Sequence, residues 1–151
     1  MKYTRELMNG FIIFLGIGIY FIILELLGIS DVFIMRLFNI FIIGYGVNRT
    51  LKANVADGVR GYFRNFLSGV MTSMIGALLS ILALFIYVES RGGEPYLKTL
   101  AEAFIIGGGD IDSYQYAIAM LLFESTAGTL IVCFCLMQYY KDKVEVINKI
   151  D

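Results

Sequence analysis

The chain has 151 residues, of which 58% are hydrophobic and only 17% are charged, and its formal net charge is −1. This balance excludes an ordinary soluble domain and gives no indication of a nucleic-acid partner. The chain contains no histidine, which leaves little room for an imidazole base or a histidine-rich metal site. We therefore expect no enzymatic activity, no catalytic residue, no metal site and no cofactor.

Four long apolar runs follow one another along the chain, and each approaches the roughly 20 residues that cross a hydrocarbon core. The runs cover residues 8–29, 32–48, 65–88 and 115–139. They predict an all-α, polytopic membrane protein with four transmembrane helices in a bundle. Residues 1–151 are expected to form a single membrane domain.

Three connections separate these runs. The first, after residue 29, is too short for anything but a tight helical hairpin. The second, residues 49–64, is basic and predicts a topology anchor at the lipid headgroups, with a partner site or an anionic-lipid site as the alternative.

The third connection contains a predicted short helix at residues 94–106. Pro95 suits its first turn, and a run of glycines follows its end. The apolar face of this helix consists of Leu97, Leu100, Ala101 and Phe104. An amphipathic segment of this kind is expected to lie on the outer membrane surface.

The basic residues are distributed unevenly between the two sides of the predicted membrane domain. Nine of the twelve lie on the side of the termini and of the second connection: Lys2, Arg5, Arg49, Lys52, Arg60, Arg64, Lys141, Lys143 and Lys149. Only Arg36, Arg91 and Lys98 fall on the opposite side. Because short basic segments remain in the cytoplasm, we predict a bacterial inner-membrane protein with both termini cytoplasmic.

Glu124 lies inside the fourth apolar run, roughly 13 Å from its outer end at a rise of 1.5 Å per residue. Tyr20, Asn39 and Ser80 fall at similar depths in the other three runs. An ionised carboxylate there costs about 2.5–3.5 kcal/mol, so Glu124 must be protonated, hydrogen-bonded or in contact with water. One interpretation is a proton- or ion-binding carboxylate. The other is a structural acid that forms a hydrogen bond with one of these three residues or with Thr126.

Glu25 and Arg36 flank the predicted hairpin between the first two runs. At a rise of about 1.5 Å per residue they fall at similar depths near the outer surface. Opposite charges in this arrangement predict a salt bridge between the first two helices.

The third run carries a stripe of small residues on one helical face, made of Gly69, Ser73, Gly76, Ser80 and Ala83. Small residues let transmembrane helices approach closely, so we expect another helix in this groove. The fourth run is the expected occupant, with Gly128 facing Gly76 or Ser73.

Two segments carry a resemblance to a known family: Phe63–Glu89 and Phe123–Lys141. They resemble a family of small four-span inner-membrane proteins of Bacteroidota, domain-of-unknown-function family 4199. The resemblance covers the phenylalanines that enter the third run, the small residues Gly69–Ser73, and the acid Glu124 followed by small residues up to Gly128. It implies the four-span architecture and the inner membrane, and it implies no particular activity.

Two functions are open at this point. The first is an accessory or scaffold subunit of a larger inner-membrane complex, with membrane lipids and other membrane subunits, or further copies of itself, as partners. The second is a small proton- or ion-coupled transporter or channel that uses Glu124 together with Asn39 and Tyr20. An enzyme within the membrane is the least favoured class, because no nucleophile is paired with a base in the sequence.

Overall fold

The computed structural model describes residues 3–101 and 114–144 of the chain. This part of the chain is built from helices. They are α1 (Tyr3–Leu26), α2 (Phe33–Leu37), α3 (Asn39–Ala56), α4 (Tyr62–Ser90), α5 (Glu94–Ala101) and α6 (Tyr114–Val144). The all-α class predicted from the sequence is therefore confirmed.

Three of these helices are long and apolar enough to cross a membrane: α1, α4 and α6. They correspond to the first, third and fourth predicted runs, although α4 begins at Tyr62 and α6 extends to Val144. Three such helices in one small chain indicate a membrane protein.

The second predicted run, residues 32–48, is organised differently from the prediction. It begins with the short helix α2 and continues, after a one-residue irregularity at Phe38, into α3, which ends only at Ala56. The polar residues that made 49–64 look like a loop, Asn54 among them, find partners inside the protein. The helix can therefore continue through them, and only a short turn at residues 57–61 separates α3 from α4.

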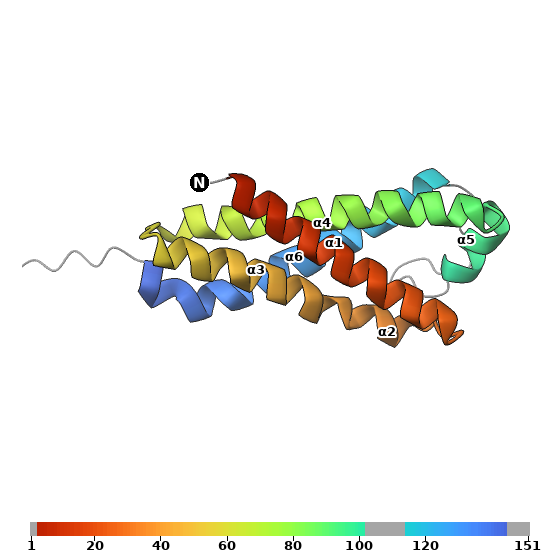
Figure 1. Cartoon of the computed structure of the whole chain (residues 1–151), viewed down its shortest axis with the longest axis horizontal. Helices are drawn as coiled ribbons and strands as arrows, with labels where there is room; N and C mark the ends of the chain where they lie inside the picture. The colour runs from red at the N-terminus through yellow and green to blue at the C-terminus, as the bar shows by residue number, and fades with distance from the viewer. Residues whose placement is uncertain (1–2, 102–113, 145–151) are drawn as a thin grey trace, which may run out of the picture.

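The helices pack as a bundle in which α3 and α4 each contact both α1 and α6. Figure 1 shows α1 and α6 crossing the long axis obliquely, on opposite sides of the α3–α4 pair. Two apolar clusters fill the interior. One lies at the end of the bundle near the N-terminus and is centred on Ile13, Val47 and Met137. The other lies at the opposite end and joins α4, α5 and α6.

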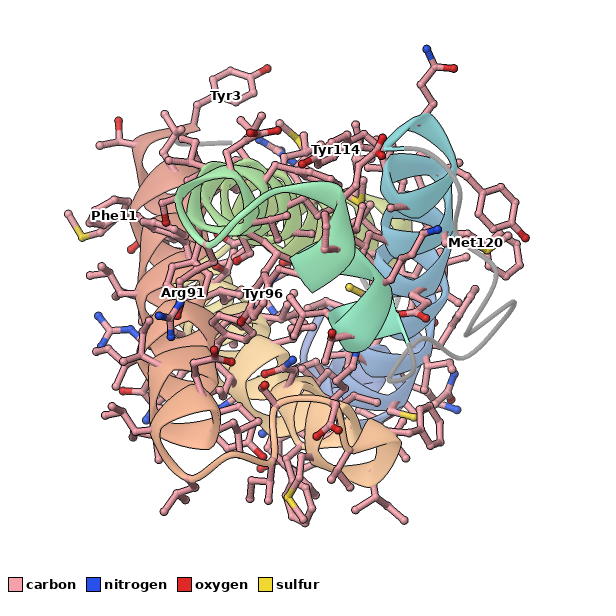
Figure 2. The ribbon with its side chains drawn as sticks, turned by 90° about the vertical axis from the view of Figure 1, so that its right-hand side faces the viewer. Tyr3, Phe11, Arg91, Tyr96, Tyr114 and Met120 are labelled. Atoms are coloured by element: carbon pink, nitrogen blue, oxygen red, sulfur yellow. The ribbon has the colours of Figure 1, made fainter. Side chains whose placement is uncertain are left out.

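The short helix α5 closes that opposite end of the bundle, as Figure 2 shows. Leu97 and Leu100 are almost completely buried and pack with Val88 of α4 and Ala117 of α6. The expectation of an apolar face turned to the outer membrane surface is wrong for these two leucines, because the protein itself covers them. Phe104, with the rest of the helix predicted to reach 106, lies outside the described residues.

Candidate functional site

Glu124 forms an ion pair with Arg36. The Nη2 atom of Arg36 in α2 donates to Oε2 of Glu124 in α6 over 2.7 Å, and the two side chains are 24% and 10% exposed. A charge-assisted hydrogen bond of this length neutralises both groups where water is scarce. Glu124 was predicted to need a polar partner, and the structure provides Arg36. The sequence had predicted that Arg36 would pair with Glu25 instead.

The predicted pair of Glu25 and Arg36 is therefore wrong. Glu25, near the end of α1, accepts from Nη2 of Arg91 at the end of α4, over 3.3 Å. The reason is geometric: α1 packs along α4, so the last turn of α1 meets the end of α4. Arg91 also donates to the Tyr87 hydroxyl. Burial and the adjacent Glu25 carboxylate raise the pKa of the Tyr96 hydroxyl in α5.

Tyr20, Asn39 and Ser80 do not gather around Glu124 as partners. The Tyr20 hydroxyl donates to the backbone carbonyl of Met35 over 2.9 Å. The Ser80 hydroxyl donates to the Gly76 carbonyl of its own helix. Thr126 likewise bonds back to Leu122. The Asn39 Oδ1 atom is buried and has no hydrogen-bond partner among the described residues.

The bond from Tyr20 lies beside the irregularity at Phe38. Around it the backbone forms i→i−3 hydrogen bonds, from Phe38 to Met35 and from Phe41 to Phe38. The Met35 carbonyl thus accepts from both the Phe38 N–H and the Tyr20 hydroxyl. Tyr20 therefore fastens α1 to the junction between α2 and α3.

The groove formed by the small residues of α4 is filled, and its main occupant is α1. A Cβ atom on Gly76 would lie 2.6 Å from Cγ2 of Ile13 and 3.0 Å from the Gly10 carbonyl. Ile13 is fully buried and also fills the space over Gly46 of α3. The expectation of a helix in this groove is confirmed, but the expected occupant at Gly76 is wrong.

Helix α6, which corresponds to the fourth predicted run, contacts the small residues of α4 nearer the N-terminal end of α4. Gly69 faces Val47 of α3 and Cys133 of α6, and the Ser73 hydroxyl bonds to the Thr129 hydroxyl over 2.7 Å. Gly128 faces open space, so it meets neither Gly76 nor Ser73. The prediction for Gly128 was wrong by one position along α6, which is a rotation of about 100°.

A second polar site lies between α1, α3 and α4, and the sequence did not predict it. We call it the polar cluster; its buried members are Glu6, Asn9, Thr50, Asn54, Ser68 and Thr72. One chain of hydrogen bonds runs from Arg5 to Oδ1 of Asn54 (2.6 Å), from Nδ2 of Asn54 to Ser68 (2.9 Å), and from Ser68 to Oε1 of Glu6 (2.5 Å). Every donor in this chain points toward the Glu6 carboxylate.

A second chain runs beside the first. Arg49 donates to Oδ1 of Asn9, and Nδ2 of Asn9 donates to the Thr50 hydroxyl over 2.9 Å. The hydroxyls of Thr50 and Thr72 are 2.9 Å apart, and Thr72 bonds to the Ser68 carbonyl. Two arginines thus reach one buried region through neutral side chains.

The Glu6 carboxylate is 1% exposed, and its Oε2 atom has no hydrogen-bond partner among the described residues. The same part of the chain contains no group of three His, Cys, Asp or Glu side chains able to share a metal ion. The cluster is suited to holding helices in register through directed polar contacts.

The sequence does contain a signal for the polar cluster. Polar residues recur at helical spacing near the basic end of each contributing segment: Glu6 and Asn9; Thr50 and Asn54; Ser68 and Thr72. The sequence pattern alone places Glu6 in a cytoplasmic N-terminus, Asn9 in the first apolar run and Asn54 in a loop. Joining these segments requires the packing of α1 against α3 and α4.

Comparison with known proteins adds no relative: no family model, no curated protein and no solved structure matches this chain.

Proposed function

We propose that the chain is a non-enzymatic integral membrane protein that serves as an accessory or scaffold subunit of a larger complex in the bacterial inner membrane. The ion pair between Arg36 and Glu124 carries this proposal. It uses the most deeply placed acid of the sequence to join α2 to α6. A carboxylate that holds two helices together is unsuited to loading and releasing a transported cation, because each loading step would break the pair.

The packing of the bundle supports the same proposal. Ile13 and the polar cluster fill the interior between α1, α3 and α4, so the helices form a fixed unit. Large apolar side chains cover the outside of that unit, including Phe11 and Ile19 of α1 and Phe134 of α6. Such a surface suits lipid and the apolar faces of other membrane subunits.

In the proposed orientation, α1, the α2–α3 pair, α4 and α6 are the four spans, and both termini are cytoplasmic. The basic end of the bundle supports this arrangement. Arg5, Lys52, Arg60 and Lys143 lie at the end where α1 begins and α6 finishes, as the antiparallel course of the helices requires. The proposal includes membership of domain-of-unknown-function family 4199, which the segments Phe63–Glu89 and Phe123–Lys141 resemble.

The proposal is tested by purification from native membranes. The tagged chain, extracted in a mild detergent, should migrate on native gels as a complex of fixed stoichiometry that contains other membrane subunits. The complex should survive the Glu124→Gln substitution if enough folded protein is recovered. A chain that runs only as a monomer or homodimer, and that conducts protons in liposomes until Glu124 is replaced, would establish the transporter instead.

A further inference from the structure

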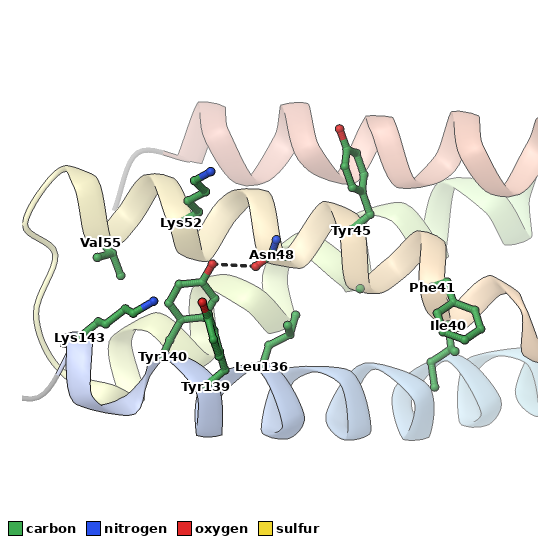
Figure 3. Close-up of a pocket in the computed structure, with 11 residues that line it drawn as sticks. Ile40, Phe41, Tyr45, Asn48, Lys52, Val55, Leu136, Tyr139, Tyr140 and Lys143 are labelled. Carbon is green, nitrogen blue, oxygen red and sulfur yellow. Dashed lines mark hydrogen bonds between the residues drawn. The ribbon is translucent and has the colours of Figure 1, made fainter.

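We propose that the groove between α3 and α6 binds one anionic phospholipid of the leaflet at the basic end of the bundle. Figure 3 shows this groove, which has a volume of about 700 Å³. The inference uses the placement of the chain in a membrane and is independent of the scaffold role.

The groove has two chemically different halves. Ile40, Phe41 and Leu136 line one half with apolar side chains. Lys52, Lys143 and Tyr139 line the other half, and none of the described residues that line the groove is acidic. The polar half therefore complements a phosphate, and the apolar half complements an acyl chain.

The length of the groove matches one leaflet. Lys52 and Ile40 are twelve residues apart on α3, which corresponds to about 18 Å along the helix. One leaflet contributes about half of the roughly 30 Å hydrocarbon core. An acyl chain that starts beneath the lysines would thus reach the apolar end of the groove near the middle of the bilayer.

Two details of the groove support a lipid as its occupant. Gly44 lies on the same face of α3 as Phe41, and a Cβ atom at Gly44 would meet only open space, so the missing side chain deepens the groove. The Lys143 ammonium group lies 4.2 Å from the centre of the Tyr139 ring. Among the described residues this ammonium group has no acidic partner, and aromatic residues with lysine are common where headgroups lie.

The sequence contains no tryptophan, so a single introduced tryptophan reports on one site. We would place it in the groove with Phe41→Trp, and on α1 with Phe11→Trp as the control. Each variant is reconstituted with brominated phosphatidylglycerol or brominated phosphatidylcholine, whose acyl chains quench tryptophan fluorescence on contact. At position 41 the anionic lipid should bind more tightly by roughly fivefold for each lysine, since each contributes about 1 kcal/mol near the surface. At position 11 the two lipids should quench alike.

Charge variants identify the headgroup half. In the Phe41→Trp background, Lys52→Gln with Lys143→Gln should abolish the preference for the anionic lipid. Lys141→Gln with Arg64→Gln removes the same charge from the same end of the bundle outside the groove and should preserve the preference. Equal quenching by both lipids at position 41 would overturn the proposal, and so would an equal loss in the two double variants.

A glycine variant identifies the acyl half. Gly44→Leu should reduce quenching at position 41 by both lipids, whereas Gly18→Leu, also in open space, should leave it unchanged. Unchanged quenching in Gly44→Leu would show that no acyl chain occupies the groove. Weak quenching by both lipids in the Phe41→Trp protein, together with a dimer on native gels, would assign the groove to a second copy of the chain and overturn the proposal.

Discussion

Arg36 and Glu124 are 88 positions apart in the chain and 2.7 Å apart in the fold. Their contact joins the short helix α2 to the first half of α6, and Glu25 pairs with Arg91 at the end of the bundle. The pairing of Arg36 with Glu124 therefore changes the predicted partners of both acids, Glu124 and Glu25.

Removing the acid of this pair should destabilise the bundle. In Glu124→Gln the largely buried Arg36 guanidinium loses its ion pair with Glu124, at a cost of about 2–3 kcal/mol in the free energy of unfolding. This is less than for a fully buried pair, because the Arg36 side chain remains 24% exposed. Titration with sodium dodecyl sulfate in mixed micelles measures the change.

Two controls accompany this measurement. Glu25→Gln should have a much smaller effect, because its partner Arg91 is exposed and water replaces the contact. Arg36→Met combined with Glu124→Met should recover most of the lost stability, since no charge remains buried. A double variant as unstable as the sum of its single changes would show that the two residues do not interact.

The Ser68 hydroxyl should contribute more to the free energy of unfolding than the Ser80 hydroxyl. Ser68→Ala removes the donor to Glu6 and the acceptor of Asn54, so unfolding should become easier by about 1–3 kcal/mol. Ser80→Ala removes only a bond to its own helix and should change stability by less than about 0.5 kcal/mol. Equal effects in the same unfolding assay would mean that the polar cluster does not hold α1, α3 and α4 together.

Gly76→Ala should be disruptive although it adds only a methyl group. The new Cβ atom would lie 2.6 Å from Ile13 and 3.0 Å from the Gly10 carbonyl, and neither can move freely. We expect a loss of about 1–3 kcal/mol from overpacking. Gly128→Ala meets open space and should be neutral or stabilising by up to about 1 kcal/mol, because alanine favours helices. A neutral Gly76→Ala would mean that α1 does not occupy the groove.

The proposed topology can be tested by labelling single cysteines after Cys133 and Cys135 are replaced by serine. In intact cells a membrane-impermeant maleimide should label Ser90→Cys, at the end of α4, and should not label Arg60→Cys, in the exposed turn before α4. After lysis both positions should react. The opposite pattern in intact cells would place the basic end of the bundle outside the cytoplasm.

The sequence alone predicted the features that depend on consecutive residues. Runs of apolar side chains gave α1, α4 and α6 within a few residues at most ends, because the hydropathy of a helix is a property of its own segment. The stripe on α4 was also correctly predicted to receive another helix. Residues 49–64 were predicted less well, because polar side chains such as Asn54 look solvated until the helices that satisfy them are known.

Only the tertiary structure decided which side chains meet. Partners such as Arg36 and Glu124, or Glu6 and Ser68, depend on how far each helix is rotated and shifted against its neighbours. Those quantities are set by close packing, for instance by Ile13 between Gly46 and Gly76. A rotation of about 100° places the next residue on the contact face, which is why Thr129 and not Gly128 meets Ser73.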